Sequence, residues 1–331
     1  VTFAFDRLGR KTNAASSVSA HAFVYTDLDL VSETIVRAGT TNVIDRSHDT
    51  LGRTTGFSLD SAYSVSYGYD GLGRFSSISS SVLSVSSVVN YSYLPSSDLI
   101  SSISNMQSQI HTTRSYEDHR NLLTQLRNSV GTNDISQFDY VNDSLSRRIA
   151  RNDSGLSFLE SVTTNAFGYN TRSEIVSADM GTNAYAYAYD PIGNLLGSTN
   201  NGASAVYTAN ALNQYTAISN LQSETTIAYD PDGNTTNNGR FVFTWDAENR
   251  LTSAETLTNL VGTSVPAVRL EFQYDYMSRR VAKTVYSGFT NNQYQITNNH
   301  VFLYNGWNMI RELITDNGSL ITNSYVYGLD L

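Results

Sequence analysis

Short runs of alternating hydrophobic and polar residues, each ended by a turn-forming tetrad, follow one another along the chain. In residues 184–189, tyrosine occupies every second position, so a strand places three rings on one face and three alanines on the other. Asp190, Pro191 and Gly193 then fill the first, second and fourth positions of a tetrad, as a type I turn favours. This stretch predicts a strand, a tight turn and a second strand.

The same tetrad recurs through the sequence. Copies with a first-position acid and a fourth-position glycine pair Asp6 with Gly9, Asp49 with Gly52, Asp70 with Gly73, Asp190 with Gly193, and Asp230 with Gly233. Looser copies have Asn or Ser in fourth place, such as Asn249, and begin at Asp118, Asp143, Asn170, Asn210, Asp246, Asp275 and Asn305. Degenerate copies of the repeat are expected near Asp98 and within residues 25–35. The repeat of about 20 to 30 residues has room for two or three short strands.

Repetition of this kind predicts an all-β fold of tandem hairpins that form one long, curled sheet. No 3.6-residue period persists for three turns, and we find no linker or second domain, so residues 1–331 are expected to form one continuous array. The acids should lie at hairpin tips. Gly193 and Gly233 should have positive φ, the conformation that lets a tight hairpin keep its twist.

Aromatic rows before the turns are interpreted as packing surfaces. The rows are Tyr185-Tyr187-Tyr189, Phe241-Phe243-Trp245 and Leu270-Phe272-Tyr274. Each row has the period of a strand and ends at a turn acid, as expected for a face packed against neighbouring rows. Sugar stacking by Trp245 or Trp307 is the less favoured alternative.

The repeated pattern Tyr-Asp-x-x-Gly-Arg/Asn-hydrophobic resembles the YD repeat of Rhs proteins, which also occurs in wall-associated bacterial toxins, insecticidal toxin-complex B and C components, and teneurins. The resemblance covers essentially the whole chain, and residues 323–331, NSYVYGLDL, resemble the point where such repeats enter the Rhs-associated core region. It implies a spiral strip of hairpins that forms a hollow shell around a C-terminal polypeptide. The family's self-cleavage site and variable toxin would lie beyond Leu331.

The amino-acid composition restricts the possible classes of protein further. The chain has 40% hydrophobic residues and only 15% charged residues, which is typical of a folded protein with a real core. It has no cysteine, so a disulfide scaffold and a thiolate zinc site are excluded. A net charge of −9 with scattered arginines argues against nucleic-acid binding. The sequence contains no apolar run of 18 residues, so it predicts no membrane-spanning segment. Val1 begins inside a repeat, so any signal peptide would belong to a longer precursor.

Candidate chemistry is sparse. The five histidines are far apart in sequence and lack metal-binding spacing. The run DPDGN, residues 230–234, offers two carboxylates and an amide to calcium, but its glycine is fourth, whereas an EF-hand loop requires it sixth. The turn explains the same residues. No catalytic residue, metal or cofactor is therefore expected.

Three classes of function remain open. The first, implied by the resemblance, is a non-catalytic shell segment of a secreted or surface protein, bacterial by expectation, that encloses and delivers its own C-terminal toxin. The second is an extracellular adhesion or structural module that binds glycan or protein and self-associates through its open ends. The third, an enzyme, has the least support. Reading the gene downstream of Leu331 would separate the first two classes.

Overall fold

The computed structural model describes residues 1–60, 63–82, 85–158, 162–220, 223–261, 263–290, 293–316 and 318–328. Antiparallel β-strands make up nearly all of the regular structure in these residues, and their one helical element is the 3-10 turn η1, Thr258–Leu260. The all-β prediction is confirmed. Leu329, Asp330 and Leu331, the end of the sequence YVYGLDL, lie outside the described residues.

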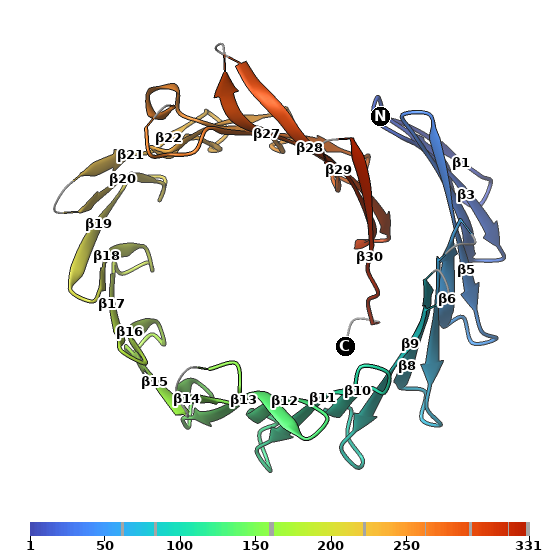
Figure 1. The fold of residues 1–331 in the computed structure, drawn as a ribbon, viewed down its shortest axis with the longest axis horizontal. Helices are drawn as coiled ribbons and strands as arrows, with labels where there is room; N and C mark the ends of the chain where they lie inside the picture. Colours follow the sequence, from blue (N-terminus) through green and yellow to red (C-terminus); the bar gives the residue numbers. More distant parts are fainter. Residues whose placement is uncertain are drawn as a thin grey trace. The chain divides into compact units, whose positions relative to one another are not determined.

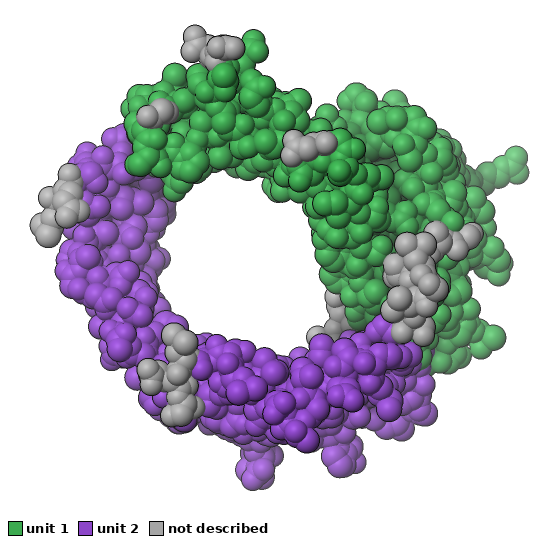
Figure 2. Space-filling view, viewed as in Figure 1, with its two compact units in different colours: residues 1–68, 78–86, 228–331 green, residues 69–77, 87–227 purple. Residues whose placement is uncertain are grey.

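The chain divides into two compact units, coloured separately in Figure 2. Unit 1 contains residues 1–68, 78–86 and 228–331, and unit 2 contains residues 69–77 and 87–227. Unit 1 therefore combines the first and last stretches of the chain.

The first stretch of unit 1 contains β1 (Thr2–Phe5), β2 (Lys11–Ala15), β3 (Ala20–Thr26), β4 (Asp29–Arg37), β5 (Thr40–His48) and β6 (Thr54–Leu59). Three strands cross the boundaries between the units, namely β7 (Tyr63–Tyr69), β8 (Phe75–Val82) and β9 (Val85–Tyr93). The last stretch of unit 1 contains β22 (Ala228–Tyr229), β23 (Thr235–Asn237), β24 (Phe241–Trp245), β25 (Leu251–Thr256), β26 (Val268–Tyr274), β27 (Arg280–Thr290), β28 (Gln293–Asn305), β29 (Asn308–Asp316) and β30 (Ser319–Ser324).

Unit 2 contains β10 (Ile100–Asn105), β11 (Ile110–Tyr116), β12 (Leu123–Val130), β13 (Asn133–Asn142), β14 (Arg148–Ser154), β15 (Val162–Tyr169), β16 (Ile175–Met180), β17 (Asn183–Tyr189), β18 (Leu195–Asn200), β19 (Ala203–Ala209), β20 (Tyr215–Asn220) and β21 (Glu224–Thr226). These strands follow one another side by side in chain order (Figure 1). Each pairs antiparallel with the next, as Tyr187 of β17 does with Ser198 of β18.

An irregularity in register accompanies many of the turns. In the β17–β18 hairpin, Tyr189 pairs with Leu195, whereas Ala188 pairs with Gly197. Leu196 is therefore an extra residue on the second strand, which is the arrangement of a β-bulge. The predicted glycine bulge is present as well, because Gly193 N donates to the Asp190 carbonyl at 3.2 Å while Asp190 N donates to the Asn194 carbonyl at 2.9 Å.

Unit 1 has two layers. One face of the first-stretch strands carries a continuous core, because cross-strand partners such as Ile44 and Leu59 share a face. This core comprises Ala14, Phe23, Ile35, Ile44, Phe57, Leu59, Tyr63 and Val65, each no more than 9% exposed. Side chains from the same strands reach the last stretch: Arg46 Nε donates to Asn305 Oδ1 at 2.9 Å, and the Tyr63 hydroxyl donates to the Tyr325 carbonyl at 2.6 Å.

Unit 2 has far fewer buried side chains. Among its described residues, the buried hydrophobic side chains are Phe75, Ile100 and Ala178. The predicted rows are less covered than expected. The row 185–189 is half-buried, as is the row 241–245 of unit 1, and in the row 270–274 only Phe272 is buried. A ring in a single-layer sheet has neighbours along the sheet but no second layer above it.

Candidate functional site

The repeated turn is a hydrogen-bonded cap built around its first residue. Asp143 Oδ1 accepts the backbone N–H groups of Leu145 and Arg147, both at 2.9 Å, and its Oδ2 accepts Arg147 Nε at 2.7 Å. The backbone closes the turn, since Ser146 N donates to the Asp143 carbonyl at 3.1 Å. A short acidic side chain at this position thus satisfies amides that the tight turn would leave without partners.

These contacts favour the ionised carboxylate. The backbone N–H of Arg147 does most to lower the pKa of Asp143, and the Arg147 side chain adds to the effect. At Asp70, burial acts to raise the pKa, but hydrogen bonds from Arg74 and Leu72 outweigh it and hold the pKa below its ordinary value. The pKa is likewise lowered at Asp6, Asp49, Asp190, Asp230 and Asp246.

The structure places the predicted turn acids at hairpin tips. The same backbone closure, from the fourth residue to the carbonyl of the first, occurs at Asp6, Asp49, Asp70, Asp143, Asn170, Asp190, Asn210, Asp230, Asp246 and Asp275. Gly193 and Gly233 have φ of 95° and 88°, as predicted, and Asn249 has φ of 57° in the same role. Gly9, Gly52 and Gly73 also have positive φ.

Two of the looser copies, at Asp118 and Asn305, are corrected by the structure. Glu117, not Asp118, closes its turn, with its N–H bonded to the Leu122 carbonyl at 2.8 Å. The degenerate copy near Asp98 is present as a turn that begins at Leu94, with its N–H bonded to the Leu99 carbonyl at 2.9 Å. Asn305 pairs directly with Asn308, so that hairpin has a two-residue tip and no capping acid.

The arginine that follows the turn connects it to the next repeat. The Arg147 guanidinium lies 5.0 Å from the centroid of the Tyr169 ring and donates to the Asn170 carbonyl at 3.4 Å. Arg74 has the same geometry, 4.3 Å from the Tyr93 ring and 2.6 Å from the Ser97 carbonyl. The guanidinium is thus held by its own turn acid while it contacts the next turn through a cation–π contact and a hydrogen bond.

A tyrosine precedes many of the turns and makes the reciprocal connection. Its hydroxyl donates to the backbone carbonyl that begins the second strand of the preceding hairpin. The pairs, all within 2.5–2.8 Å, are Tyr93 with Phe75, Tyr116 with Ile100, Tyr169 with Arg148, Tyr189 with Ile175, Tyr274 with Leu251, and Tyr304 with Arg280. Trp245 replaces tyrosine once, and its Nε1 donates to Thr235 at 2.8 Å.

Sequence reasoning missed this coupling. The sequence pattern alone predicts scattered arginines and tyrosine rings that pack against neighbouring rows. The signal was present in the motif, because a turn alone requires neither a tyrosine before the acid nor an arginine after the glycine. Each residue of Tyr-Asp-x-x-Gly-Arg therefore has a contact: the acid within its own turn, and the arginine and tyrosine between repeats.

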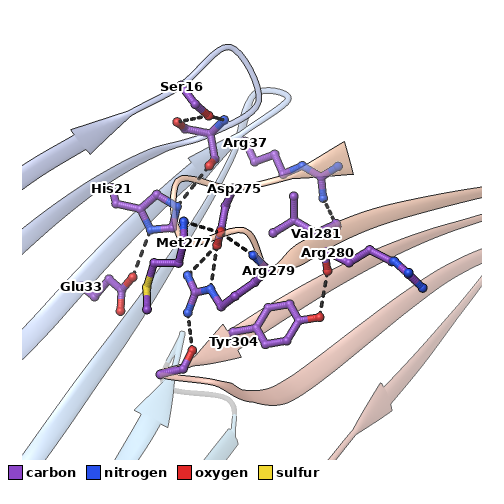
Figure 3. Close-up of polar contacts among 12 residues, drawn as sticks. Ser16, His21, Glu33, Arg37, Asp275, Met277, Arg279, Arg280, Val281 and Tyr304 are labelled. Carbon is purple, nitrogen blue, oxygen red and sulfur yellow. Dashed lines mark hydrogen bonds and ion pairs between the residues drawn. The ribbon is translucent and has the colours of Figure 1, made fainter. Parts of the chain in front are cut away.

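One copy of the turn is buried inside unit 1 (Figure 3). Asp275 and Arg279 form the same pair at 2.7 Å, with side chains 0% and 3% exposed. Next to Asp275, the Tyr276 ring lies edge-on to His21 with centroids 4.9 Å apart. Burial, with the charge of Glu33 nearby, raises the pKa of Tyr276 to about 12. This turn therefore docks onto the face of β2 and β3.

A polar cluster lies beneath the docked turn. His21 Nδ1 is 3.0 Å from Glu33 Oε1, and Arg46 contacts the other Glu33 oxygen at 2.7 Å. Burial acts to raise the pKa of Glu33, but its partners His21 and Arg46 outweigh it and lower the pKa. Both Glu33 carboxylate oxygens are thus paired, while Arg46 Nη1 is buried without a hydrogen-bond partner among the described residues. In the described residues no group of three or more His, Cys, Asp or Glu side chains could hold a metal, and Asp230 caps its own turn in the run once considered for calcium.

The two tryptophans differ. Trp245 is half-buried and takes the place of a coupling tyrosine. Trp307 lies at a hairpin tip and is 68% exposed. No helix in the described part of the chain is both long and apolar enough to span a membrane.

Comparison with known proteins connects this repeat to a family. A family model described as teneurin YD-shell matches residues 82–298. The chain belongs to the teneurin YD-shell family. The YD-repeat and Rhs resemblance is thereby confirmed, and the YD-shell fold accounts for the alternation of strand, capped turn and strand.

Two curated relatives are similar over part of the chain. The tRNA3(Ser)-specific nuclease WapA of Bacillus spizizenii is 32% identical over 146 residues, and the tRNA nuclease WapA of Bacillus subtilis strain 168 is 32% identical over 148 residues. Each match covers 43% of this chain but only 5% of the relative. The chain therefore corresponds to a small part of these proteins.

Solved structures share the fold over nearly the full chain. The crystal structure of TcdB2-TccC3-Cdc42 has a TM-score of 0.66 at 13% identity, covering 96% of this chain and 18% of that chain. A Tc holotoxin pore from Photorhabdus luminescens has a TM-score of 0.65 at 12% identity, covering 93% and 17%. At these identities the likeness shows the fold alone.

Proposed function

We propose that this chain is a non-catalytic segment of a secreted or cell-surface YD-shell that encloses and delivers a C-terminal toxin of its own protein. The coupling between repeats is the observation that carries the proposal. Because several turns contact the next through an arginine and receive a tyrosine hydroxyl bond in return, as at Arg74 with Tyr93 and Arg147 with Tyr169, the array behaves as a continuous wall. A wall made of self-capped turns requires no bound cofactor and has no catalytic residue.

The comparisons support this role. The family is described as a YD-shell, the WapA relatives are named as tRNA nucleases, and one structure with the same fold is a Tc holotoxin pore. On this proposal residues 1–331 are one stretch of a longer repeat array, and residues 323–331 lead toward an Rhs-associated core. The partner is the protein's own C-terminal polypeptide.

Protease protection tests enclosure. The product of the complete gene would carry an epitope tag at its extreme C-terminus, and tag loss would be followed during limited proteolysis. The expected result is a tag that survives at protease levels that destroy the same C-terminal part expressed alone, and that becomes sensitive when the shell unfolds. Equal cleavage rates in the two contexts would reject enclosure.

A second candidate, adhesion to a protein or glycan, has one specific observation in its favour. The third turn position carries exposed aliphatic side chains, 66% to 77% exposed, at Leu8, Leu51, Leu72, Leu145, Ile192 and Leu212. The turn cap does not use these side chains, and repeated exposed apolar groups are typical of contact surfaces. Cell-binding and glycan-array assays of the wild type and a Leu145→Ser, Ile192→Ser, Leu212→Ser triple variant would test this candidate function. Unchanged binding by the variant would show that these exposed turn side chains are not the contact surface.

A further inference from the structure

A constellation at the start of unit 1 is repeated side chain for side chain near its end. The equivalent residues are Phe3 and Phe272, Asp6 and Asp275, Arg10 and Arg279, Lys11 and Arg280, His21 and His300, Phe23 and Phe302, Tyr25 and Tyr304, and Glu33 and Glu312. Each copy consists of two blocks. The first block, Phe, Asp, Arg and a second cation, has the same internal spacing in both copies, and so does the second block, His-x-Phe-x-Tyr followed by Glu.

The two copies also share geometry. The His21 Nδ1 to Glu33 Oε1 distance is 3.0 Å, and the matching distance from His300 to Glu312 is 2.7 Å. Phenylalanine stacks on histidine in both, with ring centroids 6.2 Å and 6.1 Å apart. The cation lies over the first phenylalanine in both copies, at 4.8 Å for Lys11 and 4.1 Å for Arg280.

The first copy is occupied. The Tyr276 ring lies 6.0 Å from Phe3, 4.9 Å from His21 and 6.3 Å from Phe23 between ring centroids. Lys11 Nζ lies 4.4 Å from the centre of the same ring. Every one of these four contacts comes from a residue that has an equivalent in the second copy, so the constellation works as a receptor for the tyrosine of a docked turn.

The second copy borders a hollow. Arg280, Phe302, Tyr304, Trp307 and Met309 line it, and Tyr304 and Arg280 can be followed in Figure 3. His300 and Glu312 keep 11% and 14% of their side chains exposed, against 2% and 4% for His21 and Glu33. The His-Glu pair is therefore less covered in the second copy. Of the four receptor equivalents, Arg280 and Phe302 line the hollow, while Phe272 is 8% exposed, against 48% for Phe3.

We propose that this hollow is a docking site for a β-turn that presents tyrosine directly after its capping acid. The tyrosine ring would enter between Arg280 and Phe302, where a cation–π contact and edge-to-face aromatic packing reproduce those made by Tyr276. Trp307, exposed at the rim, adds apolar area. This inference stands on the duplication inside unit 1 and does not depend on enclosure of a toxin.

A peptide of this chain's own turn is the probe. Residues 270–283, cyclised through a D-Pro-Gly link that holds the hairpin, would be titrated into the full chain and followed by fluorescence anisotropy. We expect saturable binding that weakens at least tenfold when the peptide carries Tyr276→Ala. Absence of binding, or equal binding by both peptides, would overturn the proposal.

Two variants of the chain localise the peptide. Arg280→Ala should weaken binding about tenfold, whereas Lys11→Ala, the matched change in the occupied receptor, should leave it unchanged. Circular dichroism would confirm that both variants fold. Equal effects of the two changes would show that the peptide competes for the first receptor, and the proposal would fail.

The NMR signals of the methionine methyl groups report peptide binding without a substitution in the proposed binding site. Binding should shift the Met309 signal through the tyrosine ring current and leave Met106, Met180 and Met277 in place, with Met309→Leu used only for assignment. A shift at Met277 in place of Met309 would mean that the internal turn had been displaced, which contradicts docking in the hollow.

Discussion

The strands β2–β7 of unit 1 and β15–β20 of unit 2 use the same hairpin and the same capped turn, but only the first set has a covered face. In the first set Ile44 and Leu59 are fully buried, whereas in the second Tyr187 is half-buried and Val206 is 56% exposed. The turns are equally well capped in both. Local hydrogen bonding thus specifies the hairpins, and stability beyond that depends on whether a second layer lies over the aromatic face.

The largest expected difference between the regions comes from removing one tyrosine in each. Tyr63 is 1% exposed and packs edge-on to Phe57 at 5.7 Å, so Tyr63→Ala leaves a cavity and should cost about 3 to 5 kcal/mol. Tyr187→Ala removes a half-buried ring and should cost about 1 to 1.5 kcal/mol, roughly half the value of full burial.

Denaturant midpoints, together with hydrogen exchange resolved by unit, would measure both costs. Exchange should rise in unit 1 for the first variant and stay local to β16–β19 for the second. Equal costs would contradict the assignment of a covered and an open face.

A second difference concerns the turn acid. In the covered region Asp275→Asn keeps an oxygen for the backbone amides but leaves Arg279, 3% exposed, without its carboxylate, at an expected cost of about 3 to 5 kcal/mol. The matched change Asp246→Asn breaks a pair whose side chains are 22% to 25% exposed, so its cost should be about 1 kcal/mol or less.

Thermal melts of the two variants decide between burial and turn geometry as the source of the effect. If turn geometry alone mattered, both variants would lose the same stability. Addition of salt should reduce the Asp246 effect more than the Asp275 effect, because exposed pairs are screened.

The sequence was sufficient for the local part of the fold and insufficient for the layering. Residues within five positions of one another decide the turn at Asp190, so its strand, cap and positive-φ glycine were predictable. The contact between Tyr276 and His21 joins residues 255 positions apart, and no local pattern distinguishes a covered row from an open one. At Glu117 and Leu94 the turn survives without aspartate, because backbone closure carries it there.

The candidate site was likewise predictable from the sequence only in its local part. The role of the acid followed from turn chemistry, but the arginine and tyrosine contacts act between neighbouring repeats and required the register between hairpins. The His-x-Phe-x-Tyr block was visible twice in the sequence. Its role as a contact surface became clear only from the structure, in which Tyr276 packs against the first copy.

A smaller effect is expected from the fourth turn position. Gly193→Val and Gly233→Val force a residue with a Cβ into φ of 95° and 88° and should each cost about 1 to 2 kcal/mol. At Gly193 the added Cβ would meet only Glu174 Oε1 at 3.4 Å, so backbone strain and not a clash sets the cost.

Asparagine is the matched control at these glycines. Asn213 and Asn249 already have φ of 59° and 57°, so Gly193→Asn should lose clearly less stability than Gly193→Val in the same melt. Equal losses would show that the position does not require a left-handed backbone.

The smallest effect should come from an exposed turn acid and should depend on pH. Burial acts to raise the pKa of Asp190, but the side chain and backbone of Asn194 outweigh it, and the pKa lies below 3.8. A depressed carboxyl pKa stabilises the fold above the unfolded value and loses that contribution as pH falls through the folded value. Asp190→Asn should therefore lower the melting midpoint slightly between pH 5 and 7, and the difference from wild type should shrink below about pH 3.8.

The neighbouring turn supplies the reverse test. Asn210 holds the equivalent amides, with its Oδ1 accepting Leu212 N at 2.9 Å and Gln214 N at 3.0 Å, so an amide fills the cap without ionising. Asn210→Asp should raise the midpoint slightly at neutral pH, because the same N–H groups then meet a full negative charge. At pH 3 the gain should be smaller, since the pH has then fallen below the ordinary carboxyl pKa. A difference that stays constant from pH 7 to pH 3 in both variants would mean that side-chain shape, and not ionisation, determines the strength of the cap.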